Sequence, residues 1–254
     1  MPSDADLLAI ARDHAVEAGA LAVRRRREGV SVAATKSSPV DVVTETDREV
    51  EAFIRARLAE LRPDDGFFGE ESDAAESRSG LTWVVDPIDG TVNFLYDIPA
   101  WAVSIGVVEG APDPATWTAI AGCVVNPVLG EVFTAVRGQG AFLGDERIQV
   151  SGATDLALSL VGTGFAYSAE TRRIQAAVVT DLIGQTRGVR RIGSAALDLC
   201  SVAAGRLDAY YERGLSPWDH AAGALIAAEA GARVTGLAGA PATLEPLFVP
   251  DFNA

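Results

Sequence analysis

The sequence predicts a two-part protein of the α+β and α/β type, and three features of its hydrophobic pattern support this. Two amphipathic helices are expected first. Closely spaced strands without intervening helices follow, which indicates an antiparallel sheet beside the helix pair. Strands and helices alternate from about residue 155, which indicates a mixed, partly parallel sheet. We therefore expect an N-terminal α+β half at residues 1–147 and a C-terminal α/β half at residues 148–254.

The two N-terminal helices have recognisable start signals. Ser3-Asp4-Ala5-Asp6 has the pattern of a capping box. Apolar side chains then recur at helical spacing, at Leu7, Leu8, Ala11, Ala15, Ala18 and Ala22. A second helix should start at Thr44-Glu45-Thr46-Asp47, and Pro63 and Gly66 end it. Its apolar face consists of Val50, Phe53, Ile54, Leu58 and Leu61.

Short apolar runs bounded by Gly, Pro and Asn predict the strands. In the first half they lie at 66–68, 83–85, 102–108, 119–125, 131–136 and 140–143. A linker near 145–154 should join the halves. In the second half, strands are expected at 158–161, 189–192, 209–212 and 233–235, with helices at 169–183, 195–204 and 220–230.

The composition is acidic and excludes some partners. The chain has 35 Asp and Glu against 21 Lys and Arg, a formal charge of −14. Such a surface repels nucleic-acid phosphate and anionic membranes, so we expect neither as a partner. The basic run Arg24-Arg25-Arg26-Arg27 is interpreted as the solvated end of the first helix, facing the helix dipole. An acidic balance also suits a protein that concentrates divalent cations.

The two cysteines and the apolar stretches indicate the compartment. Cys123 and Cys200 lie far apart in apolar surroundings, which favours buried thiols in a reducing compartment over a disulfide or a metal site. Residues 1–8 lack the basic and apolar regions of a signal peptide, and no uncharged apolar stretch reaches membrane-spanning length. We expect a soluble, cytoplasmic protein.

One twelve-residue segment carries most of the predicted chemistry. It runs Trp83-Val84-Val85-Asp86-Pro87-Ile88-Asp89-Gly90-Thr91-Val92-Asn93-Phe94. A buried strand delivers Asp86 to its carboxyl end, and Asp89 follows on the same turn. Two such carboxylates repel each other unless protons or cations intervene, and their oxygens suit Mg²⁺. Gly90 permits close backbone approach, and the amides of residues 90–92 begin a helix that can bind phosphate.

Three other segments contain candidates that also have ordinary structural interpretations. Glu70 lies in Gly69-Glu70-Glu71-Ser72, which alone is typical of a solvated loop. Asp47 closes the capping box of the second helix, in the segment 41–47. Asp219, in Trp218-Asp219-His220, is well placed as a helix N-cap. We interpret His14 as a helix-surface residue and His220 as a helix-start residue, and assign neither a catalytic role.

Taken together, these segments resemble the inositol monophosphatase family of lithium-sensitive, magnesium-dependent phosphatases, and its actinobacterial branch in particular. The resemblance covers almost the whole chain. It includes Lys36-Ser37-Ser38-Pro39-Val40-Asp41, Arg191-Ile192-Gly193-Ser194-Ala195-Ala196-Leu197-Asp198-Leu199 and Asp208-Ala209-Tyr210-Tyr211-Glu212. It implies a layered αβαβα sandwich with a metal site between the halves, usually in a homodimer. A brief loop after Glu71 and the tail Thr243-Leu244-Glu245-Pro246-Leu247-Phe248-Val249-Pro250 depart from the common pattern.

The resemblance implies a role for each matching position. A first Mg²⁺ would be held by Glu70, Asp86 and the Ile88 carbonyl, and a second by Asp86, Asp89 and Asp219, with a weaker third ion near Glu70. Asp47 and Thr91 match the pair that orients the attacking water, and we count Glu70 with them as catalytic. The substrate-binding positions would be Asp89, Gly90, Thr91, Gly193, Ala195, Glu212 and Asp219, of which the Gly90 and Thr91 amides would bind phosphate.

The reaction implied is hydrolysis of a small sugar or polyol phosphate, with inositol monophosphate as the leading substrate. A metal-activated water attacks in line, and no phosphoenzyme forms. Histidinol phosphate, fructose 1,6-bisphosphate and 3′-phosphoadenosine 5′-phosphate are the alternatives within the family. Glu212 favours a polyol, because a carboxylate can accept hydrogen bonds from adjacent hydroxyls. A base-stacking aromatic in the substrate rim would favour a nucleotide, and the sequence does not decide this.

Two rival functions lie outside this chemistry. The segment Asp86-Pro87-Ile88-Asp89-Gly90-Thr91 is superficially similar to the nucleophile loop of phosphatases that form an aspartyl-phosphate. Its aspartates are three residues apart rather than two, and the other segments would stay unexplained. The second rival is a non-enzymatic role as the binding partner of a macromolecule. The complete set of carboxylates argues against lost catalysis but leaves such a role open as an addition.

Overall fold

The computed structural model describes residues 2–36, 42–236 and 246–247. The motif residues 37–41 lie outside this part of the chain, as do residues 243–245 and 248–250 of the unusual tail. Within the described ranges, no helix combines the length and the hydrophobicity needed to cross a membrane.

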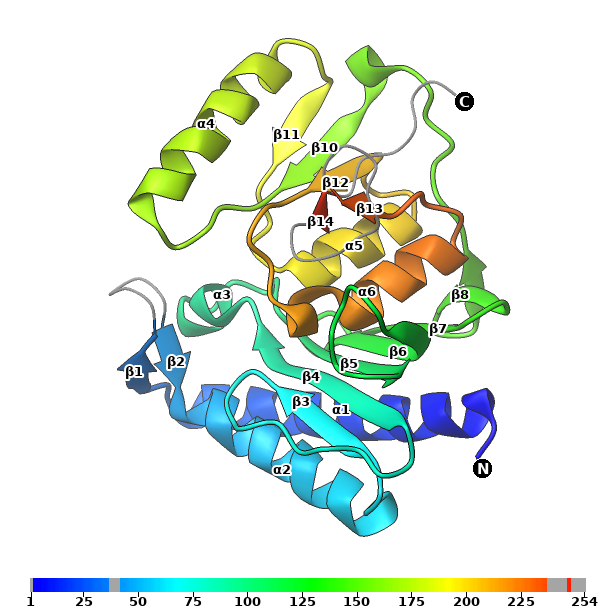
Figure 1. Cartoon of the computed structure of the whole chain (residues 1–254). Helices are drawn as coiled ribbons and strands as arrows, with labels where there is room; N and C mark the ends of the chain where they lie inside the picture. Colours follow the sequence, from blue (N-terminus) through cyan, green and yellow to red (C-terminus); the bar gives the residue numbers. More distant parts are fainter. Residues whose placement is uncertain (1, 37–41, 237–245, 248–254) are drawn as a thin grey trace.

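Two long helices cover one face of the larger sheet (Figure 1). Helix α1 (Asp4–Glu28) begins with the predicted capping box between Ser3 and Asp6, and α2 (Glu45–Leu61) begins with the one between Thr44 and Asp47. Most of their apolar side chains pack against the larger sheet, as the helical spacing predicts. Leu61, which we placed on the apolar face of α2, is instead 56% exposed, because it is the last residue of the helix. His14 is only 7% exposed, so its interpretation as a surface residue is wrong. His14 lies three residues after buried Ala11 and four before buried Ala18, so helical spacing places it on the buried face of α1.

The larger sheet has seven strands in sequential order. They are β3 (Gly66–Gly69), β4 (Leu81–Asp89), β5 (Ala102–Glu109), β6 (Thr118–Asn126), β7 (Glu131–Val136), β8 (Gly140–Leu143) and β9 (Glu146–Ile148). Neighbours pair antiparallel from β4 onward, as predicted. The exception is β3, which pairs parallel with β4 in the register Gly69↔Val85. The carboxyl ends of both strands therefore meet at one edge, which brings Glu70 next to Asp86.

Two helices lie against the opposite face of this sheet. They are α5 (Ala195–Ala203) and α6 (Pro217–Glu229). Helix α6 approaches β5 and β6 closely, since a Cβ added at Gly106 would lie 3.0 Å from Ala221 Cβ, and one at Gly122 would lie 3.0 Å from Ala222 Cα. Glycine in the strands and alanine on the helix thus set the depth of α6. This packing holds the amino-terminal end of α6 near the edge where β4 ends.

A smaller sheet and one outer helix complete the layers. Strands β10 (Leu160–Thr163), β11 (Gly188–Arg190) and β12 (Ala209–Tyr211) form a parallel sheet in the order β11-β10-β12. Helix α4 (Ala169–Ile183) lies outside it. Figure 1 shows the succession α1/α2, large sheet, α5/α6, small sheet and α4, which confirms the layered αβαβα sandwich. Cys123 and Cys200 are buried free thiols within it, as predicted.

Several short elements were not predicted. Strands β1 (Val32–Thr35) and β2 (Val42–Thr44) pair antiparallel, and β9 lies in the segment that we expected to be a linker. The short helix η1 (Leu156–Leu158), before β10, was not predicted either, whereas α3 (Thr91–Leu95) follows β4 at the helix start expected at residues 90–92. Strand β13 (Thr235–Gly236) overlaps the strand expected at 233–235 only at Thr235, and it pairs antiparallel with β14 (Pro246–Leu247), which was not predicted. The division at residue 147 stays a prediction.

The basic run at the end of α1 does more than face solvent. Arg25 donates to both carboxylate oxygens of Glu49 on α2, at 2.6 Å each. Arg26 lies 3.4 Å from the Asp97 carboxylate beyond α3. The run ends α1 as predicted, with Arg25, Arg26 and Arg27 in the last turn, and the side chains of Arg25 and Arg26 also tie α1 to its neighbours.

Candidate active site

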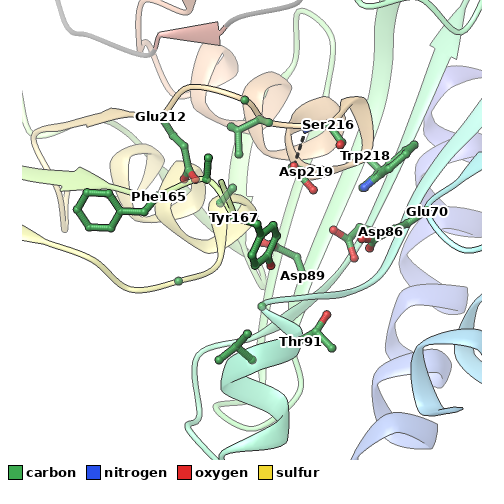
Figure 2. A pocket seen from close by; sticks show the side chains of 18 of the residues that line it. Glu70, Asp86, Asp89, Thr91, Phe165, Tyr167, Glu212, Ser216, Trp218 and Asp219 are labelled. Carbon is green, nitrogen blue, oxygen red and sulfur yellow. Dashed lines mark hydrogen bonds between the residues drawn. The ribbon is translucent and has the colours of Figure 1, made fainter. Parts of the chain in front are cut away.

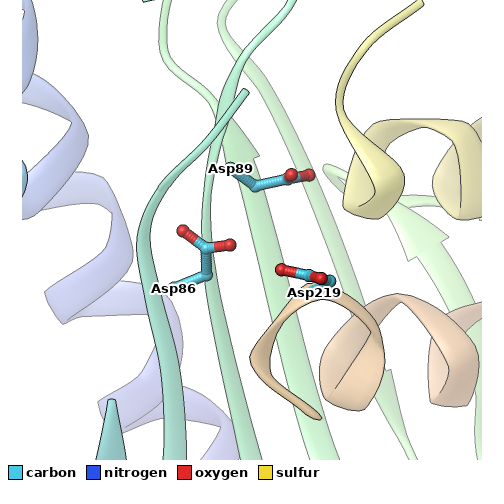
Figure 3. A group of neighbouring side chains, drawn as sticks. All are labelled: Asp86, Asp89 and Asp219. Carbon is cyan, nitrogen blue, oxygen red and sulfur yellow. The ribbon is translucent and has the colours of Figure 1, made fainter. Parts of the chain in front are cut away.

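Three carboxylates meet where β4 ends and α6 begins (Figure 3). Asp86 and Asp89 come from the carboxyl end of β4, and Asp219 from the first turn of α6. One oxygen of each lies within 4.8 Å of the others. Asp86 and Asp89 are buried and Asp219 is partly buried, so solvent screens their charges only weakly. Oxygen ligands at this spacing can share a hard divalent cation.

Burial and mutual repulsion make these carboxylates hard to ionise without a cation. Desolvation, with Glu70 and Asp89 as charged neighbours, raises the pKa of Asp86 well above its ordinary value. Desolvation and Asp89 raise the pKa of Asp219 in the same way. Desolvation raises the pKa of Asp89 to about 6 and that of Glu70 to about 7. A cation that neutralises the cluster would offset this cost.

Hydrogen bonds orient each carboxylate of the cluster. Asp86 Oδ1 accepts from the Ile88 amide at 3.0 Å, and Asp219 Oδ2 accepts from the Ser216 amide at 2.6 Å. Asp89 Oδ2 accepts from Ser194 Oγ and from the Ala196 amide. Asp219 therefore closes a capping box of α6 and still contributes to the cluster. Its predicted cap role and its predicted site role are compatible.

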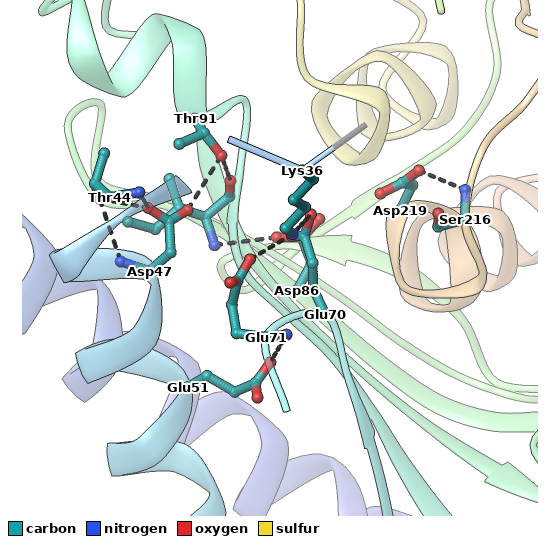
Figure 4. A network of polar contacts seen from close by, with 11 residues as sticks. Lys36, Thr44, Asp47, Glu51, Glu70, Glu71, Asp86, Thr91, Ser216 and Asp219 are labelled. Carbon is teal, nitrogen blue, oxygen red and sulfur yellow. Dashed lines mark hydrogen bonds and ion pairs between the residues drawn. The ribbon is translucent and has the colours of Figure 1, made fainter. Parts of the chain in front are cut away.

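A second acidic group adjoins the first. Lys36 Nζ lies 2.7 Å from Glu70 Oε1 and 2.5 Å from Glu71 Oε1 (Figure 4). Buried Glu51, on α2, accepts from the Glu71 amide at 2.8 Å. The ion pairs with Lys36 therefore hold the loop after β3 from one side, and the hydrogen bond to buried Glu51 holds it from the other. Glu70 and Glu71 are not the solvated pair that their local sequence alone indicates.

Asp47 and Thr91 form a linked pair beside the cluster. Thr91 Oγ1 lies 3.1 Å from Asp47 Oδ1 and 3.1 Å from the Ile88 carbonyl oxygen. Asp47 Oδ2 accepts from the amide and the hydroxyl of Thr44, as the capping box requires. Burial raises the pKa of Asp47 to about 6, against the lowering effect of the Thr44 bonds. Asp47 thus serves as a helix cap and also as the acceptor for Thr91.

Gly90 is required by the shape of the chain between β4 and α3. Its φ is +95°, a left-handed value that favours glycine. A Cβ there would lie 3.0 Å from the Gly193 carbonyl oxygen and 3.1 Å from that of Ala100. The backbone of residues 90–91 therefore borders the site with no side chain at Gly90 in the way.

A pocket of about 540 Å³ unites these groups (Figure 2). Ten predicted site residues line it: Glu70, Asp86, Ile88, Asp89, Gly90, Thr91, Gly193, Ala195, Glu212 and Asp219. Asp47 is not among the lining residues and reaches the site through Thr91.

Glu212 lies on the far side of this pocket from Glu70 and Asp86 (Figure 2). Tyr210 donates its hydroxyl hydrogen to Glu212 Oε2. Desolvation raises the pKa of Glu212 to about 7. A Cβ at Gly164 would lie 1.8 Å from Glu212 Oε2, so the carboxylate occupies the space that a side chain at Gly164 would need.

Sequence reasoning missed part of the pocket wall. Lys36, Arg191 and the segment 164–168, with Phe165 and Tyr167, also line it. Lys36 and Arg191 were named only as parts of matching motifs. The segment 164–168 follows β10 without regular secondary structure, and a glycine followed by aromatic residues after a strand was its only available signal.

The comparisons with known proteins agree with this site. The inositol monophosphatase family profile matches residues 4–250. The inositol-1-monophosphatase SuhB of Mycobacterium tuberculosis is 49% identical over 248 residues, which cover 91% of this chain and 83% of that protein. The Nus factor SuhB of Pseudomonas aeruginosa is 40% identical over 246 residues, covering 94% and 88%.

Solved structures share the fold as well. The extragenic suppressor protein suhB of Bartonella henselae superposes with a TM-score of 0.88 at 34% identity, over 97% of this chain and 95% of that one. The SuhB structure from Mycobacterium tuberculosis gives a TM-score of 0.83 at 44% identity, over 99% and 94%. The chain therefore belongs to the inositol monophosphatase family, as its motifs predict, and is a phosphatase.

Proposed function

We propose that the protein is a Mg²⁺-dependent phosphomonoesterase that hydrolyses myo-inositol monophosphate to inositol and phosphate by direct attack of an activated water. The observation that carries this proposal is the buried cluster of Asp86, Asp89 and Asp219, with oxygens within 4.8 Å of one another beside the Asp47–Thr91 pair. A carboxylate cluster next to a hydroxyl–carboxylate pair supplies both a cation site and a means of orienting water.

The residues present fit Mg²⁺. They offer carboxylate and carbonyl oxygens only, which a hard cation prefers. Desolvation raises the pKa values of Asp86 and Asp219, so a bound cation would favour the ionised form of these ligands. Glu70, Asp86 and the Ile88 carbonyl would hold one ion, Asp86, Asp89 and Asp219 a second, and a third would lie near Glu70. When bound, Mg²⁺ would lower the pKa of a water and offset charge on the phosphoryl oxygens and the leaving group.

The chain's own residues would orient the reactants. When Thr91 donates its hydroxyl hydrogen to Asp47, the lone pairs of Thr91 Oγ1 remain to accept from a water. Buried Asp47 could then receive a proton through Thr91. The amides of Gly90 and Thr91 would donate to the phosphate, whose position between them and the cluster favours in-line attack. No residue need be phosphorylated.

The substrate proposal rests on the far wall and on the relatives. Glu212, Gly193 and Ala195 face the space beyond the cluster, where Glu212 can accept hydrogen bonds from adjacent hydroxyls. Relatives such as that from Mycobacterium leprae, 47% identical, carry the name inositol-1-monophosphatase. Histidinol phosphate, fructose 1,6-bisphosphate and 3′-phosphoadenosine 5′-phosphate remain the alternative substrates. Lithium sensitivity, a homodimer and a cytoplasmic location belong to the same proposal.

A panel of esters tests the activity. Phosphate release is measured from inositol 1-phosphate and the three alternatives, with Mg²⁺ and with EDTA. Magnesium-dependent turnover that favours inositol 1-phosphate is the expected result. Preference for another ester would keep the mechanism and change the substrate, and the wall around Glu212 would then be examined for the residues that select it. Folded protein that releases no phosphate from any ester would refute the proposed reaction, and phosphate trapped on Asp86 would refute its mechanism.

A second role is favoured by one comparison. The Pseudomonas aeruginosa relative, 40% identical, is named as a Nus factor. We propose a macromolecular partner as an addition to catalysis. An Asp86→Asn variant without phosphatase activity should then restore growth to a deletion strain, and failure to do so from normally expressed protein would contradict the second role.

A further inference from the structure

Gln175 joins two loops that are far apart in the sequence. It is a buried residue of α4, 7% exposed, on a helix whose neighbouring side chains face solvent. Its Oε1 accepts from the Ala166 amide at 2.9 Å, and its Nε2 donates to the Arg213 carbonyl oxygen at 3.3 Å. If the side-chain amide were flipped, its NH₂ group would face the Ala166 N–H and its oxygen would face the Arg213 carbonyl oxygen. Both hydrogen bonds therefore depend on this orientation.

The two loops form one wall of the pocket. Residues 164–168 line the pocket from the chain after β10, and Glu212, Gly214, Leu215 and Ser216 line it from the chain between β12 and α6. Figure 2 shows Phe165 and Glu212 on one side and Asp86, Glu70 and Trp218 on the other, with the Tyr167 side chain between them. The wall therefore faces the alcohol portion of an ester whose phosphate lies at the carboxylates.

Two further contacts fix the position of the loop 164–168. Arg172, also on α4, donates from Nε to the Ala166 carbonyl oxygen at 2.6 Å. Side chains of α4 thus hold both polar groups of Ala166. Glu212 fills the space beside Gly164, so the separation of the two loops also sets the position of Glu212. Gln175 does not line the pocket and can act only through these loops.

We infer that Gln175 is a positioning residue that determines which alcohols the phosphatase accepts, by fixing the separation of the loops 164–168 and 212–216. This inference rests on the proposed function. Loss of the amide would leave the part-buried Ala166 amide and the Arg213 carbonyl without this partner, and the loops would move to satisfy them. A cyclic polyol that spans the pocket should depend on that separation more than a small acyclic ester does.

The experiment compares two phosphate esters on the full chain with Mg²⁺. Inositol 1-phosphate represents a cyclic alcohol, and glycerol 2-phosphate a small acyclic one. Gln175→Met keeps the volume of the side chain and removes both hydrogen bonds. Gln175→Glu keeps an acceptor for the Ala166 amide. Gln185→Met is the matched control, because exposed Gln185 makes only a local bond to the Asp181 carbonyl oxygen.

We expect Gln175→Met to lower the ratio of kcat/KM for inositol 1-phosphate over glycerol 2-phosphate about tenfold, the scale of a moderate misfit in a pocket. The change should lie in KM for inositol 1-phosphate more than in kcat. Gln175→Glu should lose less, and Gln185→Met should match the wild type. Melting temperatures verify folding. If Gln175→Met does not fold, Arg172→Met, which releases the Ala166 carbonyl oxygen, should change the ratio in the same direction.

Two outcomes would overturn the inference. If folded Gln175→Met, or Arg172→Met in its place, keeps the wild-type ratio within twofold while the wild type hydrolyses inositol 1-phosphate, the inference alone fails. If the wild type releases no phosphate from either ester with Mg²⁺ present, the proposed function fails and the inference with it.

Discussion

Asp86 and Asp219 place carboxylate oxygens within 4.8 Å of each other, although one lies on strand β4 and the other in the first turn of α6. Each is oriented by a backbone amide, that of Ile88 for Asp86 and that of Ser216 for Asp219. Like charges at this distance, one buried and one partly buried, disfavour the metal-free fold and favour a cation. Activity and stability should therefore respond in opposite directions when one charge is removed.

Asp86→Asn tests that opposition. Loss of a shared ligand should cost several kcal/mol of transition-state stabilisation, which is about 10³-fold or more in kcat with Mg²⁺. In EDTA the melting temperature of the variant should exceed that of the wild type, because a buried repulsion is gone. Asp181→Asn, on the exposed face of α4, controls for loss of an acidic residue. An Asp86→Asn enzyme with wild-type kcat would contradict the site.

Thr91 should act through its hydroxyl. Thr91→Ala removes the donor to Asp47 Oδ1, and kcat should fall by about 10²-fold, within the range of lost general acid–base help. Thr91→Ser keeps the hydroxyl and should restore most of kcat. Initial rates at saturating substrate and Mg²⁺ provide the measurement. Equal losses in both variants would show that the methyl group, rather than the hydroxyl, matters.

Glu51 should position the loop that carries Glu70. Its carboxylate accepts from the Glu71 amide and occupies the space beside Gly69, where a Cβ would meet Oε2. Glu51→Ala should raise the Mg²⁺ concentration for half-maximal activity about tenfold, as expected when a residue that orients a metal ligand is lost. Glu51→Gln keeps an acceptor and should be near wild type. Glu60→Ala, exposed on the same helix, is the control, and an unchanged magnesium requirement in Glu51→Ala would refute the role.

Gly164 should be needed for Glu212 to reach the substrate. A methyl group at Gly164 would lie 1.8 Å from Glu212 Oε2 and must displace the carboxylate. Gly164→Ala should therefore raise KM for inositol 1-phosphate by about tenfold, the scale expected when a polar contact to a substrate hydroxyl is weakened. Glu212→Gln, measured alongside, should change KM in the same direction. A Gly164→Ala enzyme with wild-type KM would show that Glu212 can act from another position.

Magnesium should stabilise the protein more as the pH rises. Burial raises the pKa of Glu70 to about 7 and that of Asp89 to about 6. A raised carboxyl pKa adds stability below the unfolded-state pKa, and this stability is lost as the pH rises through the folded-state pKa, here between about pH 4 and 7. Mg²⁺ binds the ionised carboxylates, so the gap in melting temperature between Mg²⁺ and EDTA should widen from about pH 5 to 8.

Both histidines act in the opposite sense, because burial lowers the pKa of His14 as well as that of His220, and the design controls for them. Burial lowers the pKa of His220 to about 4, which costs stability as the pH falls below the unfolded-state pKa. That contribution is present with Mg²⁺ and with EDTA, so the difference between the two curves removes most of it. A gap that stays constant or narrows with rising pH would contradict the metal assignment of the cluster.

Local signals in the sequence predicted individual elements well. The predicted bounds 131–136, 140–143 and 169–183 are those of β7, β8 and α4. Both N-terminal capping boxes form as predicted, because their bonds span only three residues. The parallel pairing of β3 with β4 could not be predicted this way. Their connection has no crossover helix, and strand direction depends on which edge each strand reaches.

What the sequence by itself determined was the chemistry available: oxygen ligands on one turn, a glycine before a helix start, and motifs whose order placed the chain in its family. Only the tertiary structure decided which groups meet. It joined partly buried Asp219 to buried Asp86, placed Asp47 behind Thr91, and used Gln175 to build a wall from two distant loops. The physical reason is that pKa, cation affinity and pocket shape depend on distance and burial, which long-range packing sets and local spacing does not.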